Sequence, residues 1–287
     1  MNRQAEHLIL ARHGRAEHNE VKRFLKPDTF EHLPPEVLAR AVEHHPLTLE
    51  GVEQAKSLGS WLSRQLIDTD GIVPNRFFVS PTVRTMQTAG YATQVLEADH
   101  PDLSIKWTID RNLRETHKGN LEQLRKLPDY DASTEPLTML PASDLYRKVD
   151  DGESIFDTMR RWEVFRETRE AQLSGQIGLV VTHGYFLGAV ELAMEADGMH
   201  DQEAMELFSA RSPGNCNVVH YSNVEPETGE VADSLRWVRA AMPYETSKGF
   251  SFDWREIGSP AVYSSAELLT TANQFERLIS PDLLEQI

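Results

Sequence analysis

Cysteine is almost absent from this chain, since Cys216 is the only one among 287 residues. A single cysteine excludes an intrachain disulfide and a cysteine-ligated zinc site, and such scarcity is typical of a reducing compartment. Long apolar runs are also missing, and no stretch has the length of a signal peptide or a membrane span. These absences predict a cytoplasmic protein that does not bind a membrane.

Positive charge is in short supply as well. Lys and Arg number 29 against 45 Asp and Glu, which gives a formal net charge of −16. Binding to a nucleic-acid backbone needs an excess of basic side chains on one face, so this balance argues against a nucleic-acid partner. An anionic ligand would therefore need a local basic island on an acidic surface.

Apolar runs of strand length end in a histidine–glycine pair at two places, residues 8–14 (LILARHG) and residues 177–184 (IGLVVTHG). Continuous apolar runs are typical of buried parallel strands, and ligands in open α/β sheets bind at the carboxyl ends of such strands. Either turn alone could be an ordinary loop. The repeat of the same order favours a shared site.

A third strand is predicted at residues 77–79, and a helix is predicted to start at Ser80 and Pro81, with Ser80 as its N-cap. Arg84 then falls in the first turn, where free backbone N–H groups and the helix dipole attract anions, although a surface ion pair is the alternative. The alternating residues 103–109 predict a strand that leads to a loop carrying Glu115.

Helices are predicted between these strands. Thr48 is suited to cap a helix whose apolar residues recur to Leu66, and Ser154 with Asp157 resembles a capping box before a helix to about Leu173. Two late strands, residues 216–221 and 235–240, are expected to pair as a hairpin at a sheet edge. A further helix is possible at residues 264–279.

Two segments interrupt this pattern. Residues 21–45 are rich in proline and histidine, and residues 120–151 are acidic and without sustained periodicity. We interpret the adjacent His44 and His45 as solvated surface rather than metal ligands, because neighbouring side chains point apart in any regular element. We expect both insertions to lie near the site and to determine substrate choice.

Several motifs in a fixed order carry a resemblance: Arg12-His13-Gly14, residues 80–89 (SPTVRTMQTA), Leu113-Arg114-Glu115 before Gly119, and Thr182-His183-Gly184. With them the chain resembles the histidine phosphatase superfamily, the phosphoglycerate-mutase-like group, over roughly residues 8–240. The resemblance implies a three-layer, doubly wound, mostly parallel α/β sheet with helices on both faces. The pocket would lie at the carboxyl ends of the strands, with the insertions forming a cap.

The resemblance also implies roles for individual residues. His13 would be the nucleophile that becomes phosphohistidine, so its other ring nitrogen should donate to a backbone carbonyl. Glu115 would protonate the leaving oxygen and later activate water. The phosphoryl oxygens would be held by Arg12, Arg84 and His183, together with Asn19 and Gly184, while Arg15 and Arg114 would enlarge the basic island. Neither a metal nor another cofactor is expected.

These roles predict a phosphatase that acts on a small phosphorylated metabolite through a phosphohistidine. Two alternatives stay open, a phosphoglycerate-mutase-type isomerase and a catalytically inactive module that binds a phosphorylated ligand. Arg15 disfavours the isomerase, because the glycolytic mutases resembled here typically carry an acidic residue after the glycine. We expect a catalytic domain over residues 1–245 and a C-terminal extension over 246–287 packed on it. The oligomeric state is left open.

Overall fold

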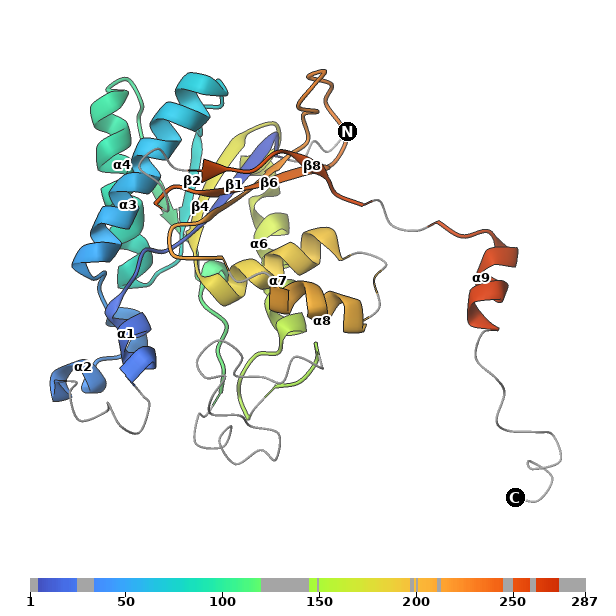
Figure 1. Ribbon diagram of the computed structural model, residues 1–287, viewed down its shortest axis with the longest axis horizontal. Helices are drawn as coiled ribbons and strands as arrows, with labels where there is room; N and C mark the ends of the chain where they lie inside the picture. Colours follow the sequence, from blue (N-terminus) through green and yellow to red (C-terminus); the bar gives the residue numbers. More distant parts are fainter. Residues whose placement is uncertain are drawn as a thin grey trace.

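The computed structural model describes most of the chain: residues 5–24, 34–119, 145–148, 150–196, 199, 201–210, 213–244, 250–258 and 262–273. Within this part, one mixed sheet of eight strands runs in the order β3-β2-β4-β1-β5-β6-β7, and β8 also pairs with β6. Helices cover both of its faces (Figure 1). The α/β class with three layers is therefore confirmed. Residues 25–33 and 120–144, expected to belong to the cap, lie outside the described residues.

Four strands pair in parallel: β1 (His7–Arg12), β2 (Arg76–Val79), β3 (Trp107–Ile109) and β4 (Ile177–Thr182). The strand predicted at residues 103–109 is shorter than expected, since β3 begins only at Trp107. Its pairing partner explains the difference. β2 starts at Arg76 and Phe77 lies opposite Trp107, so residues 103–105 have no strand beside them to pair with.

The other strands pair in antiparallel fashion: β5 (Val218–Ser222), β6 (Trp237–Met242), β7 (Phe250–Ser251) and β8 (Arg255–Glu256). The predicted hairpin of β5 and β6 is confirmed, but its place at the sheet edge is wrong. β5 pairs with β1 on its other side, and β7 and β8 pair beyond β6. α9 (Ser265–Ala272) lies apart from the sheet (Figure 1). The domain boundary near residue 245 stays a prediction.

Alternate residues of the central strands face two separate cores. Ile9, Val79 and Val181 pack on the face covered by α3 (Leu49–Trp61), the π-type η3 (Leu62–Thr69) and α4 (Val83–Asp99). Leu10, Phe78 and Val180 pack on the face covered by α6 (Ile155–Leu173) and α7 (Gly184–Glu195), with α8 (Asp201–Ala210) packed on α7. Because both faces of these strands are buried, they read as continuous apolar runs.

Helix caps are confirmed at two of the three predicted positions. Thr48 accepts a hydrogen bond from the Gly51 amide of α3, and Ser154 forms the capping box of α6 with Asp157. The prediction for α4 is wrong, since the helix starts at Val83 with Thr82 as its N-cap. The Ser80 amide instead continues the pairing with β4, bonding the Val181 carbonyl at 3.1 Å.

Short helical segments lie near the carboxyl ends of the strands: α1 (Glu17–Phe24), α2 (Pro35–Ala39), η2 (Val42–His44) and η4 (Arg111–Leu113). The prediction that His44 and His45 are both solvated is confirmed for His44 and wrong for His45. His44 is exposed, but His45 is buried, with its ring 6.1 Å from that of His18 and its Nδ1 3.6 Å from a Glu17 oxygen. In the part of the chain described, no helix is both long and apolar enough to cross a membrane.

A buried histidine pair lies at the amino end of β1. His220 Nε2 is 3.2 Å from His7 Nδ1, and Arg239 donates to the other ring nitrogen of His220 at 3.3 Å. Burial, and next the charge of Arg239, lowers the pKa of His7 to about 4. His7 is therefore neutral in the folded protein at pH values where the unfolded chain protonates it.

This shift predicts acid sensitivity that depends on His7. Stability is fully present above the unfolded pKa of 6.5 and falls as pH drops from 6.5 toward 4, by about 3 kcal/mol for this residue. Urea unfolding should show the loss. His7→Gln should lower the slope of unfolding free energy against pH by about 1.4 kcal/mol per unit. Equal slopes in wild type and His7→Gln would contradict the assignment.

Candidate active site

The two histidine–glycine turns meet at the carboxyl ends of neighbouring strands. Arg12 of β1 lies opposite Thr182 of β4, and the amide of His13 donates to the Thr182 carbonyl at 2.9 Å. The rings of His13 and His183 are therefore brought together, edge to face, with centroids 5.2 Å apart. Both side chains are almost fully buried.

His13 is held in one tautomer. Its Nδ1 lies 2.7 Å from the Gly14 carbonyl oxygen, which can only accept, so Nδ1 carries the proton and Nε2 carries the lone pair. Burial lowers the pKa of His13 well below its usual value, and the positive charges of Arg84 and Arg12 act in the same direction. His13 is thus a neutral imidazole that carries its lone pair on Nε2, and its role as nucleophile stays a prediction.

Arg84 joins the two histidines. It lies in the first turn of α4 with 1% of its surface exposed, and its Nε donates to His13 Nε2 at 3.2 Å. Nη2 contacts His183 Nδ1 at 3.3 Å, and Nη1 donates to the Val42 carbonyl at 2.7 Å. A guanidinium can only donate, so His183 accepts at Nδ1 and donates from Nε2 to Ser80 Oγ, 2.7 Å away. Ser80, predicted as a cap, supports the site instead.

Arg12 lies near the same two histidines, because its charge contributes to the lowered pKa of both. Its Nη1 donates to the Pro213 carbonyl at 2.6 Å, while its Nε is buried without a hydrogen-bond partner among the residues described. A side chain on Gly184 would collide with it, because a Cβ there would lie 3.0 Å from Arg12 Nε. Gly184 therefore makes room for the guanidinium at the start of α7.

Close backbone packing fixes the first turn. The Gly14 amide donates to Thr88 Oγ1 at 3.0 Å. A Cβ on Gly14 would lie 2.5 Å from the Gly51 carbonyl oxygen, and one on Gly51 would lie 1.9 Å from the Arg15 carbonyl oxygen. Both glycines are thus required where α3 meets the loop after β1.

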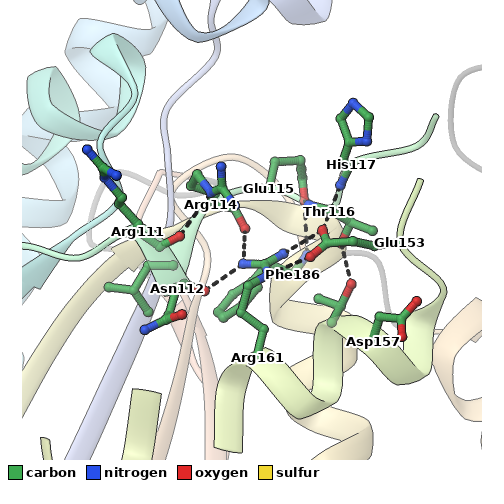
Figure 2. A network of polar contacts seen from close by, with 12 residues as sticks. Arg111, Asn112, Arg114, Glu115, Thr116, His117, Glu153, Asp157, Arg161 and Phe186 are labelled. Atoms are coloured by element: carbon green, nitrogen blue, oxygen red, sulfur yellow. Dashed lines mark hydrogen bonds and ion pairs between the residues drawn. The ribbon is translucent and has the colours of Figure 1, made fainter. Parts of the chain in front are cut away.

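Glu115 comes from the loop after β3 and reaches the start of α7 (Figure 2). Its Oε1 accepts from the Thr116 amide at 3.1 Å and from the Phe186 amide at 3.0 Å. Its negative charge raises the pKa of Arg12 and of Arg84, against a larger lowering by burial. A carboxyl group is therefore placed beside the two arginines at a helix N-terminus.

The other predicted residues have different surroundings. Asn19 accepts the Ala16 amide at its Oδ1, which leaves the amide nitrogen as the end that can donate to an anion. The Arg15 guanidinium pairs with Glu20 and Glu50, and Arg114 is exposed with its Nε on the Arg111 carbonyl. Substrate contacts of Asn19, Arg15 and Arg114 stay predictions.

Gly184→Ala tests the packing at Arg12. Its Cβ would lie within 3.2 Å of three Arg12 atoms, so the guanidinium must shift by a few tenths of an ångström. We expect kcat/KM to fall about tenfold and phosphate inhibition to weaken similarly, because small misplacements of catalytic groups are costly. Gly90→Ala is the matched control, since a Cβ on this helical glycine meets nothing within 4 Å. Equal kinetics for both variants would contradict the role of Gly184.

This arrangement suits the transfer of an anionic group. Arg84 contacts both His13 and His183, the charge of Arg12 also acts on the neutral His13, and the Glu115 carboxyl group lies close enough to raise the pKa of both arginines. The two guanidinium groups can stabilise the charge of a phosphoryl group in transfer. The described residues hold no cluster of three or more His, Cys, Asp or Glu side chains that could bind a metal ion.

Comparison with known proteins gives the family. The family model of the histidine phosphatase superfamily (branch 1) matches residues 8–233, whereas no curated protein matches the chain. Similar solved structures include Mycobacterial hydrolase 1, at 16% identity and a TM-score of 0.53 over 91% of this chain and 100% of that one. Mycobacterial glucosyl-3-phosphoglycerate phosphatase complexed with VO3 shares 17% identity, with a TM-score of 0.52 over 90% and 100%.

A third structure, Bacillus stearothermophilus YhfR, shares 21% identity with a TM-score of 0.52 over 80% of this chain and 95% of that one. At these identities the likeness shows the shared fold. The family model covers most of the chain, including the stretches that contain His13, Arg84, Glu115 and His183. The chain therefore belongs to the histidine phosphatase superfamily.

Proposed function

We propose that this protein hydrolyses a small phosphate monoester through a phosphohistidine at His13. The observation that carries the proposal is the neutral His13 with its Nδ1 tied to Gly14 and its Nε2 facing Arg84. A nucleophile needs a lone pair and a positive environment for the charge that it meets. His13 carries the lone pair on Nε2, and Arg84 supplies positive charge beside it.

The reaction proceeds in two displacements. His13 Nε2 attacks phosphorus, the bond to the ester oxygen breaks, and that oxygen takes a proton from Glu115. Water then gives a proton to the Glu115 carboxylate and attacks phosphorus, which breaks the nitrogen–phosphorus bond and releases phosphate. Arg12, Arg84 and His183 hold the phosphoryl oxygens in both steps, and the two guanidinium groups supply the charge that a metal ion supplies in other phosphatases.

The substrate that we propose is a small phosphorylated metabolite. One of the similar structures is, by its title, a glucosyl-3-phosphoglycerate phosphatase, which supports this class without identifying the ester. We propose the cytoplasm as the compartment, supported by a single buried cysteine. Neither a nucleic acid nor a membrane is proposed as a partner, given the net charge of −16.

An isomerase is the second candidate. It would need the phosphoryl group to return to a rebound product instead of passing to water. The arginine at position 15, directly after Gly14, disfavours the isomerase, because the mutases that the chain resembles typically carry an acidic residue there. In this structure Arg15 pairs with Glu20 and Glu50. An inactive binding module ranks third, since His13, Glu115 and His183 are all present.

Two assays separate these functions. Hydrolysis of an aryl phosphate should proceed at an unchanged rate in EDTA, because the positive charge comes from side chains. Complete loss of activity on chelation, with recovery on adding a divalent ion, would contradict the mechanism.

Incubation of the protein with 2- or 3-phosphoglycerate should release phosphate faster than it interconverts the two isomers. Fast exchange of the isomers with little free phosphate would favour the isomerase. No turnover of any phosphate ester would favour the binding module.

A further inference from the structure

A network centred on Arg161 of α6 surrounds the loop that carries Glu115 (Figure 2). Arg161 forms two hydrogen bonds to the Glu153 carboxylate, from Nε at 2.8 Å and from Nη2 at 2.9 Å. Its Nη1 donates to the carbonyls of Asn112 at 2.5 Å and Arg114 at 2.7 Å. The Arg161 side chain is only 10% exposed, so these bonds are shielded from water. We call Arg161 and Glu153 the loop clamp.

The loop clamp holds the chain on both sides of Glu115. On one side, Arg161 donates to the carbonyl of Arg114, the residue before Glu115. Glu153 accepts from the His117 amide at 2.9 Å, and its own amide donates to the His117 carbonyl at 2.6 Å. Both backbone groups of His117 are thus fixed two residues beyond Glu115. The peptide that carries the carboxyl group therefore has little freedom to turn or slide.

Arg161 also reaches Phe186, the residue that donates a hydrogen bond to Glu115. Its guanidinium carbon lies 5.0 Å from the centroid of the Phe186 ring, and the Phe186 amide is the donor to Glu115 Oε1. One side chain thus touches the loop that supplies the carboxyl group and the helix start that receives it. None of the hydrogen bonds of the loop clamp involves Arg12, His13 or Arg84.

We propose that Arg161 and Glu153 are positioning residues for proton transfer by Glu115. They keep the carboxyl group at the start of α7, within reach of the leaving oxygen, and do not bind the phosphoryl group. This inference rests on the proposed role of Glu115 as the acid. The inference predicts a selective effect. Loosening the loop clamp lowers kcat/KM for substrates whose leaving group needs a proton and has little effect on kcat/KM for substrates whose leaving group does not.

The same helix offers a matched control. Eight residues further along α6, Arg169 donates from Nε and Nη2 to Asp110 Oδ2 at 2.8 and 2.7 Å. Asp110 caps η4 at the beginning of the same loop by accepting the Asn112 amide at 2.9 Å. Arg169 is thus a second partly buried arginine that ties α6 to this loop, but it binds neither neighbour of Glu115.

The test compares kcat/KM for two substrates, 2,4-dinitrophenyl phosphate and glycerol 3-phosphate. The dinitrophenolate leaves without a proton, whereas the alkoxide needs one. In Arg161→Met we expect kcat/KM for glycerol 3-phosphate to fall about 100-fold and that for the aryl ester less than about fivefold, with inhibition by inorganic phosphate unchanged. Glu115→Gln should show the same selectivity more strongly, and Arg161→Lys should recover only part, because an ammonium group cannot bind the fork of Glu153 in the same way.

Arg169→Met should leave the ratio of the two substrates at its wild-type value, whatever it does to stability. An equal loss for both substrates in Arg161→Met, or the same ratio as in Arg169→Met, would overturn the loop-clamp proposal. If Arg161→Met does not fold, Glu153→Gln decides, with an expected selective loss of about tenfold. If Glu115→Gln shows no selectivity between the two substrates, Glu115 is not the acid and the proposed function is wrong on that point. If Arg161→Met is selective while Glu115→Gln is not, Arg161 does not act through Glu115 and the loop-clamp proposal is overturned.

Discussion

Replacing His13 by alanine is expected to lower kcat/KM by at least about 10⁴-fold and to abolish the burst of product that marks a covalent intermediate. Loss of a nucleophile removes the first bond-forming step, and losses of this size are typical when one is deleted. The reason in this protein is geometric: the Nε2 that Arg84 faces is the one ring nitrogen that is not held by Gly14. Stopped-flow assay of an aryl phosphate measures both effects.

The control must show that the His13 variant is folded. His13 is buried, so its loss leaves the Gly14 carbonyl and the Arg84 Nε without a partner, which should cost about 1–3 kcal/mol of stability. His220→Gln also removes a buried histidine, but one whose ring contacts His7 at the amino end of β1, and should keep the wild-type kcat. A folded His13→Ala protein that retains a tenth of the activity would rule out His13 as the nucleophile.

Replacing Arg84 by methionine is the second large effect that we expect, a fall in kcat/KM of about 10³-fold. Arg84 places one donor at each histidine and carries the charge nearest to both rings. Removal of a single preorganised donor from a transition state commonly costs 10²–10³-fold, and this change removes the charge as well. Methionine keeps most of the volume of the buried side chain, so packing is disturbed less than it would be by alanine.

The Arg84 variant should also change the pH dependence. In wild type, burial and the charge of Arg84 lower the pKa of His13, so the acid limb of kcat/KM should lie well below pH 6.5. Without that charge the pKa of His13 rises, and the acid limb should move to higher pH. Arg84→Lys keeps the charge and should shift the limb less while remaining slow. A limb that moves to lower pH would contradict the electrostatic assignment.

The strand-end position of the site was predictable because its signals are local. An apolar run followed by a polar turn marks the end of a buried strand, and this pattern placed Arg12, His13 and His183 correctly. Arg84 was predictable for a similar reason, since it lies within the first turn of a helix that follows a strand, although the helix starts two residues later than its cap residues indicate.

Contacts between distant parts of the chain were not predictable in this way. Ser80 has the residue type of an N-cap, and only the fold shows that its hydroxyl faces His183, 103 residues later. The requirement for Gly51 comes from the Arg15 backbone on another element. Arg161 is one of several charged residues on α6, and no spacing in the sequence shows that it faces the Glu115 loop.

The measurement that tests the central claim most directly is rapid-quench trapping of the enzyme during turnover of a ³²P-labelled aryl phosphate, followed by peptide mapping. The account predicts label that is stable in alkali and lost in acid, as for a phosphorylated imidazole, on the peptide that contains His13. It should form before free phosphate appears and be absent in His13→Ala. Steady hydrolysis with no protein-bound label at any quench time, or with label on a residue other than His13, would contradict it.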